Sequence, residues 1–351
     1  MSRLKFVTTA AVFLVSALVI DVGVSEARIT STNNEIRLVI PAPASAKSDG
    51  ICDDTHQIGF DEQQGVLMLE DLRVNDPNRP DNTPASEIDP IPAGTVVDSH
   101  MLLFTRCPND ESFAEKRTTW TFNRPILGTM TDEDGNLEAL STPVLGAPGT
   151  TYPSAISTFR GLEGNDFTGP APSDPGNPNK IQVRMGIRQV GDYMRVVTSG
   201  RLGVRIDIKP GSDPNCFNVN SQGVIPVAIF GSNHFDVKKI DQRTLKFGGL
   251  EVRMRGKRGP QCSIKDVDGD GKYDLVCEFE DDATVWEPND TDTTASVTGF
   301  ANGTVSYPNV PVEFRGSDAI CVKPTQPQRR RYKRSKRSKR YRHDGYRHQL
   351  R

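Results

Sequence analysis

The chain has 351 residues, of which 35% are hydrophobic and 25% are charged, and its formal net charge at pH 7 is −2. That length is enough for two domains of ordinary size, and the composition is that of a folded chain rather than a disordered one. Beyond residues 6–20 no apolar stretch is long enough to cross a bilayer, so we expect a soluble protein without a transmembrane anchor.

Residues 1–27 have the pattern of a secretory signal peptide. Arg3 and Lys5 give a positive start, residues 6–20 are mostly apolar, and residues 25–27 fit a small-x-small cleavage site. The alternative is a retained N-terminal anchor, which the short apolar run and Asp21 disfavour. Residues 28–50 lack aromatic side chains and contain Pro41 and Pro43, so we expect a leader segment there.

Six cysteines agree with export, because disulfides form and persist in oxidising compartments. Each half of the chain holds an even number, which favours pairing within each domain, and four cysteines in the second half allow three connectivities. We expect Cys262 to pair with Cys277, across the acidic loop between them. We also expect Cys216 to pair with Cys321, which would join the ends of the second domain, and pairing within the first half leaves Cys52 with Cys107. A zinc site is the alternative, but no C-x-x-C motif supports it.

The body of the chain predicts an all-β fold of two β-sandwich-like domains. Short apolar runs are separated by turns rich in Gly and Pro, and residues 181–188, 202–208 and 250–255 alternate apolar and polar side chains with the period of a strand. Residues 224–230 and 101–104 are mostly apolar strand candidates, and no window after the signal predicts an amphipathic helix. Residues 132–136 predict a hairpin tip. We place the N-terminal β domain at residues 51–199 and the C-terminal β domain at residues 200–325.

Residues 266–274, with the sequence D-V-D-G-D-G-K-Y-D, predict a calcium site. Carboxylates at alternate positions around a glycine can converge on a hard cation, which takes six to eight oxygen ligands. The predicted metal ligands are Asp266, Asp268, Asp270 and Asp274 through their side chains, and Lys272 through its carbonyl oxygen. Gly271 would take the sharp turn.

This loop is not an EF-hand. The EF-hand places a bidentate glutamate at the twelfth position, where this chain has Cys277, and the residues that follow the loop alternate like a strand. The loop therefore predicts the shorter calcium turn of β-rich extracellular modules. The alternative is a solvated Asp/Gly turn without a metal, since both residues favour tight turns.

The C-terminal end is strongly basic. Residues 329–351 hold 12 of the 43 Lys and Arg residues and one of the 45 Asp and Glu residues, which leaves 31 basic and 44 acidic residues in the rest of the chain. We expect residues 326–351 to be a disordered tail that binds polyanions, such as anionic polymers, surface glycans or the acidic body of the protein itself. A signal peptide makes nucleic acid a poorer candidate partner, and a tail that only aids solubility is the alternative. The polyanion-binding candidates are Arg329, Arg330, Arg331, Lys333, Arg334, Lys336, Arg337, Lys339 and Arg340.

Two parts of the chain resemble known proteins. The motif I-D-I-K-P-G-S-D-P-N-C at residues 206–216 is followed by G-V-I-P-V-A-I at 223–229, the acidic loop, and G-S-D-A-I-C at 316–321. Together they resemble a module of secreted proteins from environmental, often marine, bacteria, over about residues 204–323. The first half more loosely resembles exported proteins of the PEP-sorting type, but the sorting tail is missing. The resemblance implies a secreted β-sandwich-like module with a calcium loop, and no established activity.

These features favour a secreted, non-catalytic calcium-binding protein of the cell envelope or extracellular matrix, with a structural or adhesive role. One alternative is a calcium-dependent carbohydrate-binding protein, for which Trp286 would be the stacking residue and Trp120 a core residue. Another is an accessory module of a polysaccharide-acting hydrolase, with catalytic carboxylates among residues 278–282, although such a strand end is usually a solvated edge. His56, His100 and His234 lie in no nucleophile motif, so we expect no catalytic residue among them.

Overall fold

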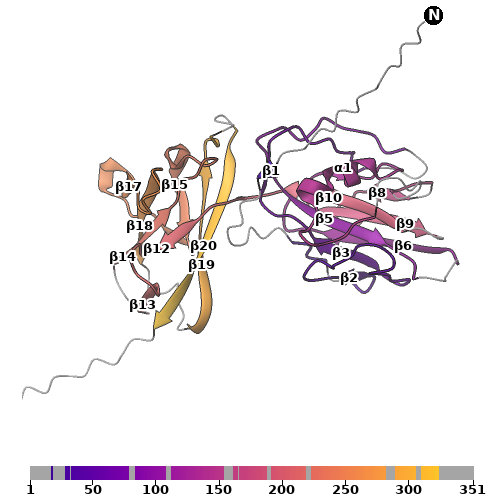
Figure 1. Cartoon of the computed structure of the whole chain (residues 1–351), viewed down its shortest axis with the longest axis horizontal. Helices are drawn as coiled ribbons and strands as arrows, with labels where there is room; N and C mark the ends of the chain where they lie inside the picture. The colour runs from indigo at the N-terminus through magenta and orange to yellow at the C-terminus, as the bar shows by residue number, and fades with distance from the viewer. Residues whose placement is uncertain are drawn as a thin grey trace, which may run out of the picture.

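The computed structural model is mostly β-strands, which confirms the all-β prediction (Figure 1). The structure describes residues 17–18, 28–31, 33–78, 84–107, 112–153, 161–164, 166–187, 191–218, 223–281, 289–305 and 310–323. The predicted signal peptide, apart from Ala17 and Leu18, and the whole of the basic tail lie outside these residues. Strands that precede residue 200 and strands that follow it form separate sheets.

The N-terminal half is built on a seven-stranded sheet. Its strands are β1 (Ala17–Leu18), β2 (Ile36–Leu38), β3 (Gln57–Asp61), β4 (Val66–Met68), β5 (Val96–Phe104), β7 (Ile126–Met130) and β10 (Asp192–Ser199). The central path runs β1-β4-β5-β10-β7, with β3 pairing to β5 and β2 pairing to β3. Every residue of β5 is buried, because both faces of this central strand are covered.

A three-stranded sheet covers one face of the seven-stranded sheet. It consists of β6 (Ala114–Thr121), β8 (Phe167–Gly169) and β9 (Lys180–Ile187), in the order β6-β9-β8. Alternate residues of β9 are buried, as the sequence predicts for residues 181–187. They share a hydrophobic cluster with Leu102 and Met194 of the larger sheet and with Trp120, which is fully buried. Trp120 is therefore a core residue, as expected, and Trp286 lies outside the described residues.

The one α-helix in the described residues, α1 (Asn136–Leu145), covers the opposite face and is a feature that the sequence prediction missed. The predicted hairpin tip at residues 132–136 is wrong: the chain turns into α1 instead of returning as a strand. Asp132 stabilises the helix start, because its carboxylate accepts hydrogen bonds from the backbone N–H groups of Asn136 (2.6 Å) and Leu137 (3.1 Å). Leu137 and Leu145 then pack into a cluster with residues of β5, β7 and β10.

Residues 28–50, which the sequence led us to expect as a leader segment, lie against the N-terminal sheets. Ile29 is buried in the cluster between the two sheets, and β2 pairs in parallel with β3. The apolar side chains of this segment are buried through this packing. The segment is therefore part of the β structure in spite of its prolines, and the leader-segment prediction is wrong for it.

The C-terminal half is a sandwich of a six-stranded and a four-stranded sheet. The larger sheet has the path β11-β20-β19-β15-β16, with β13 pairing to β20, and the smaller has the order β12-β14-β18-β17. The larger sheet contains β11 (Leu202–Gly203), β13 (Cys216–Asn218), β15 (Ile240–Phe247), β16 (Leu250–Glu251), β19 (Asn289–Ala301) and β20 (Val312–Lys323). The smaller sheet contains β12 (Ile206–Ile208), β14 (Gly223–Ile229), β17 (Cys262–Lys265) and β18 (Asp274–Asp281). Two 3-10 turns, η1 (Val237–Lys239) and η2 (Gly256–Arg258), complete the fold.

Two strand predictions in this half are only partly correct. Residues 202–208 form β11 and β12 rather than one strand, because the chain passes from the larger sheet to the smaller one between them. The crossing brings it against Gly316 of β20, where an added Cβ would lie 2.4 Å from Cγ2 of Ile206 and 2.6 Å from the Val204 carbonyl oxygen. Of the strand predicted at residues 250–255, Leu250 and Glu251 form β16, and Val252 and Met254 form isolated β-bridges.

The two halves meet through apolar packing and through ion pairs. Leu67 and Val96 of the N-terminal sheet belong to the same hydrophobic cluster as the C-terminal core. Beside this contact, Glu313 of β20 accepts from Arg124 (2.6 Å) and from Arg201 (2.6 Å), one residue on each side of the junction. The two halves are thus joined by packing as well as by the connecting chain.

Candidate metal centre

The acidic loop is the tip of a hairpin in the C-terminal sandwich. It joins β17 to β18, whose register pairs Lys265 with Asp274 and Cys262 with Cys277. Gly269 (φ 77°) and Gly271 (φ 83°) both adopt left-handed conformations, which glycine reaches without the penalty of a β-carbon. The sharp turn predicted at Gly271 is confirmed, and Gly269 supplies a second one.

Three of the four predicted carboxylates converge. Asp266, Asp268 and Asp274 each place a carboxylate oxygen within 4.8 Å of the others. Because calcium binds oxygens at about 2.3–2.6 Å, two ligands of one ion lie at most about 5 Å apart, so this spacing fits a single calcium ion. Asp270 is outside this group, and its Oδ2 lies 3.0 Å from Nζ of Lys272. The roles of Asp270 and of the Lys272 carbonyl as ligands stay predictions.

Backbone hydrogen bonds hold the converging carboxylates in place. Asp266 accepts from the N–H groups of Gly269 (2.7 Å) and Gly271 (3.0 Å). Asp274 is 1% exposed and accepts from Val267 (2.7 Å) and from Gly231 (2.9 Å), which lies outside the loop. These bonds orient the side chains before any ion binds, which lowers the entropic cost of assembling a site.

Two cationic side chains also contact the loop carboxylates. Nη2 of Arg205 lies 3.2 Å from Oδ2 of Asp268, and its guanidinium stacks over the ring of Phe230, 4.6 Å from the centroid. Hydrogen bonds from Lys272 hold the pKa of Asp270 below its ordinary value. Part of the repulsion between the carboxylates is therefore offset within the protein itself.

The three predicted cysteine pairs are all present as disulfides: Cys52–Cys107, Cys216–Cys321 and Cys262–Cys277. The Cys262–Cys277 disulfide joins β17 to β18, the two strands that carry the acidic loop. It lies three residues from the Lys265–Asp274 pair at which the loop begins and ends. Disulfides of this number fit a chain that folds in an oxidising compartment.

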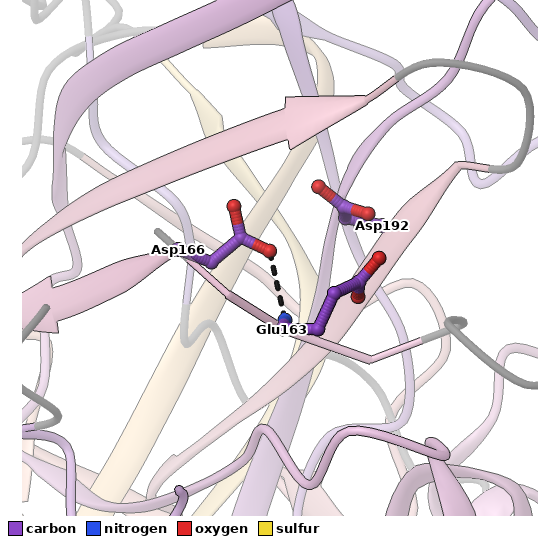
Figure 2. Close-up of side chains that lie close together, drawn as sticks. All are labelled: Glu163, Asp166 and Asp192. Carbon is purple, nitrogen blue, oxygen red and sulfur yellow. Dashed lines mark hydrogen bonds between the residues drawn. The ribbon is translucent and has the colours of Figure 1, made fainter. Parts of the chain in front are cut away.

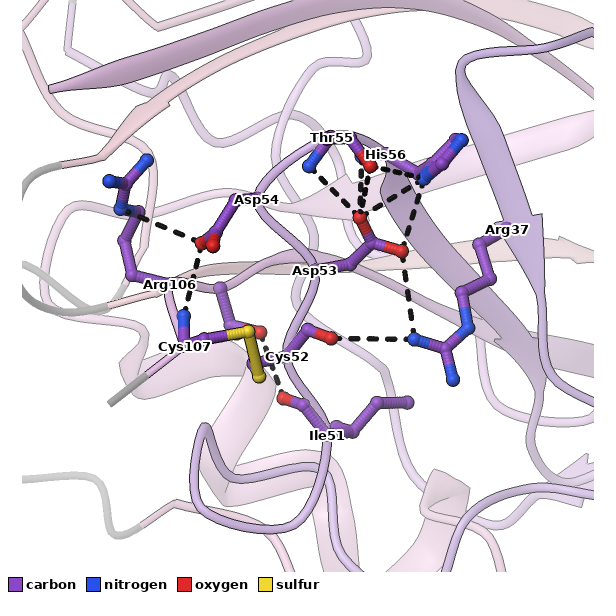
Figure 3. Close-up of a disulfide and its surroundings, with 10 residues drawn as sticks. Arg37, Ile51, Cys52, Asp53, Asp54, Thr55, His56, Arg106 and Cys107 are labelled. Carbon is purple, nitrogen blue, oxygen red and sulfur yellow. Dashed lines mark hydrogen bonds and ion pairs between the residues drawn. A yellow bond between two sulfur atoms is a disulfide. The ribbon is translucent and has the colours of Figure 1, made fainter. Parts of the chain in front are cut away.

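The first disulfide is surrounded by charged side chains (Figure 3). Asp54 accepts from the backbone N–H of Cys107 (3.1 Å), and Nη1 of Arg37 lies 3.6 Å from Oδ2 of Asp53. Burial raises the pKa of Asp53, but hydrogen bonds from Thr55 and His56 outweigh it and lower the pKa to about 2. Every one of these groups has a partner, so the cluster braces two loops and offers no open metal position.

A second acidic cluster was not predicted from the sequence. Glu163, Asp166 and Asp192 also place carboxylate oxygens within 4.8 Å of one another (Figure 2). Asp166 accepts from the N–H groups of Glu163 (2.9 Å) and Gly186 (2.9 Å), so it fixes the loop before β8 against β9. The three residues lack a regular spacing in the chain, and Asp192 meets the other two because the three-stranded sheet packs on the seven-stranded sheet.

The three histidines named in the sequence analysis lie in different surroundings. His100 has the contacts of a catalytic triad, with Nδ1 2.7 Å from Asp61 Oδ1 and Nε2 3.0 Å from Thr198 Oγ1. However, His100 and Thr198 are both fully buried, so no substrate can reach the hydroxyl. Nδ1 of His56 lies 3.0 Å from Oδ1 of Asp53, which also accepts from the Thr55 hydroxyl. His234 lines a pocket of about 250 Å³ next to the acidic loop.

Carboxylates near the end of β18 contact neighbouring side chains. Glu278 accepts from Nε2 of Gln261, and Glu280, whose side chain is 59% exposed, lies 3.4 Å from Nε of Arg253.

Within the described residues, no α-helix has the length and apolar character needed to span a bilayer. The chain matches no known protein-family model, no curated protein and no solved structure.

Proposed function

We propose that this protein is an exported, non-catalytic calcium-binding protein with a structural or adhesive role in the cell envelope or extracellular matrix. The observation that carries the proposal is the convergence of Asp266, Asp268 and Asp274 at the tip of a disulfide-joined hairpin. A calcium ion at this point would offset two of the three negative charges and join the loop to Asp274, which already bonds to the segment before η1. The ion would supply rigidity rather than chemistry, because it would link the hairpin tip to the segment that follows β14.

Calcium titration of the full chain tests this proposal. By linkage, an ion that binds only the folded state raises the free energy of unfolding by about 2.7 kcal/mol at a hundredfold excess over its Kd. We expect calorimetry to show one strong site and chelation to lower the melting temperature. Asp268→Asn should weaken calcium binding at least tenfold while leaving the fold intact, since an asparagine oxygen can still accept from Asp270.

The matched control is Glu280→Gln, which removes one exposed carboxylate from the same hairpin but outside the converging group. It should leave calcium binding unchanged. An absence of calcium binding in the unmodified protein, or an equal loss in both variants, would refute the proposal. Magnesium should bind more weakly, because it requires near-ideal octahedral geometry and gives up its water ligands reluctantly.

Calcium-dependent carbohydrate binding is the second candidate. Tyr273, in the acidic loop, is 56% exposed, and an exposed aromatic ring beside bound calcium could stack on a sugar. Nζ of Lys238 lies 3.8 Å from the centroid of this ring and limits access to one face. A glycan array in calcium and in chelator separates the two candidates: calcium-dependent signals that Tyr273→Ala abolishes would favour sugar binding.

The basic tail is the second part of the proposed function. Nine basic residues between Arg329 and Arg340 would bind anionic polymers by releasing their counterions, so affinity should fall steeply with salt. Retention of the full chain on heparin, compared with a chain that ends at residue 325, tests this role. Equal retention would refute it.

A further inference from the structure

The C-terminal sandwich has an acidic pocket that is separate from the candidate metal centre. It has a volume of about 450 Å³ and lies between the turn that follows β12 and the middle of β20. Its lining residues are Ile206, Asp207, Gly211, Ser212, Asp213, Asn215 and Asp318. Three of these seven residues are aspartates, and none is basic.

The carboxylates of this pocket lack a cationic partner within its walls. Asp318 accepts from the backbone N–H groups of Ile208 (3.0 Å) and Ala319 (2.7 Å), which fixes its position without adding a positive charge. Burial and the charges of Asp318 and Asp213 raise the pKa of Asp207. Lys209 follows the pocket strand but donates its Nζ to the Cys216 carbonyl oxygen (2.6 Å). The pocket is therefore electrostatically suited to a cation.

A buried acceptor in the wall also lacks a donor. Asn215 is only 9% exposed, and its Nδ2 donates to Asp318 Oδ2 (2.9 Å) and to the Ala319 carbonyl oxygen (3.1 Å). Because both of these partners are acceptors, the amide orientation is fixed. Oδ1 of Asn215 then has no hydrogen-bond partner among the described residues. A buried oxygen left without a donor costs stability, and a ligand that donates hydrogen bonds would remove that cost.

The geometry favours an organic cation over a metal ion. In the described part of the chain, three acidic oxygens converge within 4.8 Å only at the acidic loop and at the Glu163 cluster, and not in this pocket. An ion bound by Asp207, Asp213 and Asp318 together would need them closer. An ammonium or a guanidinium on an alkyl stem can instead contact separated carboxylates, and its stem can lie against Ile206.

The chain itself carries such cations close to the pocket. Asp318 lies in β20, which ends at Lys323, and the first residue of the basic run is Arg329. Lys323 lies five residues beyond Asp318 in the strand, about 17 Å away, and the ten residues from Lys323 to Lys333 can extend over about 33 Å, which is enough for the basic run to fold back to the pocket. A tether this short gives an effective concentration in the millimolar range. The body, with 44 acidic and 31 basic residues outside 329–351, attracts the same segment at longer range.

We propose that this pocket binds a lysine or arginine side chain from residues 326–351 of the same chain. Asp207, Asp213 and Asp318 supply the negative charge, and Oδ1 of Asn215 accepts one hydrogen bond from the bound group. Polyanions compete with the pocket for the tail, so binding of the tail to the pocket lowers the affinity of the full chain for polyanions.

Carbodiimide cross-linking of the full chain, read by mass spectrometry, tests the proposal because the reagent joins amines only to carboxylates in direct contact. We expect cross-links from Lys333, Lys336 or Lys339 to Asp318. The variant with Asp207→Asn and Asp213→Asn should reduce their yield at least fivefold and should increase the salt needed to elute the full chain from heparin.

The control variant removes two exposed carboxylates elsewhere in the same domain, Glu251→Gln and Glu280→Gln. It should change neither cross-linking to Asp318 nor heparin retention. Mixing isotope-labelled and unlabelled copies separates contacts within one chain from contacts between chains. If the double aspartate variant does not fold, Asp213→Asn alone, at an exposed residue, repeats the test.

Three outcomes would overturn the proposal. They are cross-links spread evenly over the acidic surface without preference for Asp318, an equal loss in the control variant, and cross-links found only between different copies.

Discussion

Asp98 allows a quantitative prediction about pH and stability. It lies in the fully buried strand β5, is 1% exposed, and accepts from the backbone N–H of Gly65 (2.5 Å) through Oδ1. Its Oδ2 has no hydrogen-bond partner in the described part of the structure. Burial raises the pKa of Asp98 to about 7, although the Gly65 hydrogen bond and the charge of Arg124 act in the opposite direction.

The sign of the effect follows from proton binding. An unfolded chain releases the Asp98 proton near the ordinary pKa of 3.8, whereas the folded protein keeps it up to about pH 7. Folding therefore binds a proton between these values, and the contribution of Asp98 to stability falls as pH rises from about 4 to about 7. At 1.36 kcal/mol for each pKa unit the full difference is about 4 kcal/mol, and relaxation of the interior should leave about 1–3 kcal/mol of it.

Asp98→Asn should remove this dependence, because asparagine is uncharged and keeps an oxygen that can accept from Gly65. We expect the variant to exceed the unmodified protein by about 1–3 kcal/mol in unfolding free energy at pH 8, and to match it more closely at pH 4.5. Urea denaturation followed by Trp120 fluorescence, with Trp286 replaced by Phe in all proteins, measures the N-terminal half.

Asp89→Asn, at an exposed aspartate of the same half, is the control and should not alter the pH dependence. If the stability difference between Asp98→Asn and the unmodified protein is the same at pH 4.5 and pH 8, the reasoning from burial is refuted.

Three further predictions concern stability. Arg195→Met should destabilise the protein by about 3–5 kcal/mol, because Arg195 is fully buried with Nε 2.6 Å from Glu62 and its loss leaves buried carboxylates unpaired; adding Glu62→Gln should restore part of the loss in urea denaturation. Replacing both Cys262 and Cys277 by Ser should cost about 3 kcal/mol, the value for a loop of 15 residues, and should lower the calcium affinity measured by calorimetry. Gly316→Ala should cost about 1–3 kcal/mol in thermal unfolding, because its Cβ would lie 2.4 Å from Ile206, and an unchanged melting temperature would show that the two sheets can separate there.

The sequence predicted those features that depend on short-range patterns. Alternation of apolar and polar residues predicted β9, since a strand with one buried face repeats every two residues, and a mostly apolar run predicted β14. The spacing of the acidic loop predicted the convergence of Asp266, Asp268 and Asp274, because all three lie on one hairpin tip.

Features that depend on contacts between distant segments were missed. Pro143 lies within α1 and weakens its helical signal, and the helix forms because its apolar residues cover the face of a sheet whose strands come from three separate segments. Glu163 and Asp192 meet through the packing of two separate sheets. The switch between sheets at Val204 depends on the absence of a side chain at Gly316, more than a hundred residues later.

The disulfides also determine which parts of the chain a protease can remove. Cys216 and Cys321 close a covalent ring of the chain between them, which contains β14 to β19 and the acidic loop, so a single cut within that ring leaves both fragments attached. Residues 324–351 lie beyond Cys321 and outside every ring. Cleavage after Arg329 would release most of the basic residues of this end while leaving the sandwich covalently whole, and the remaining protein would be more acidic.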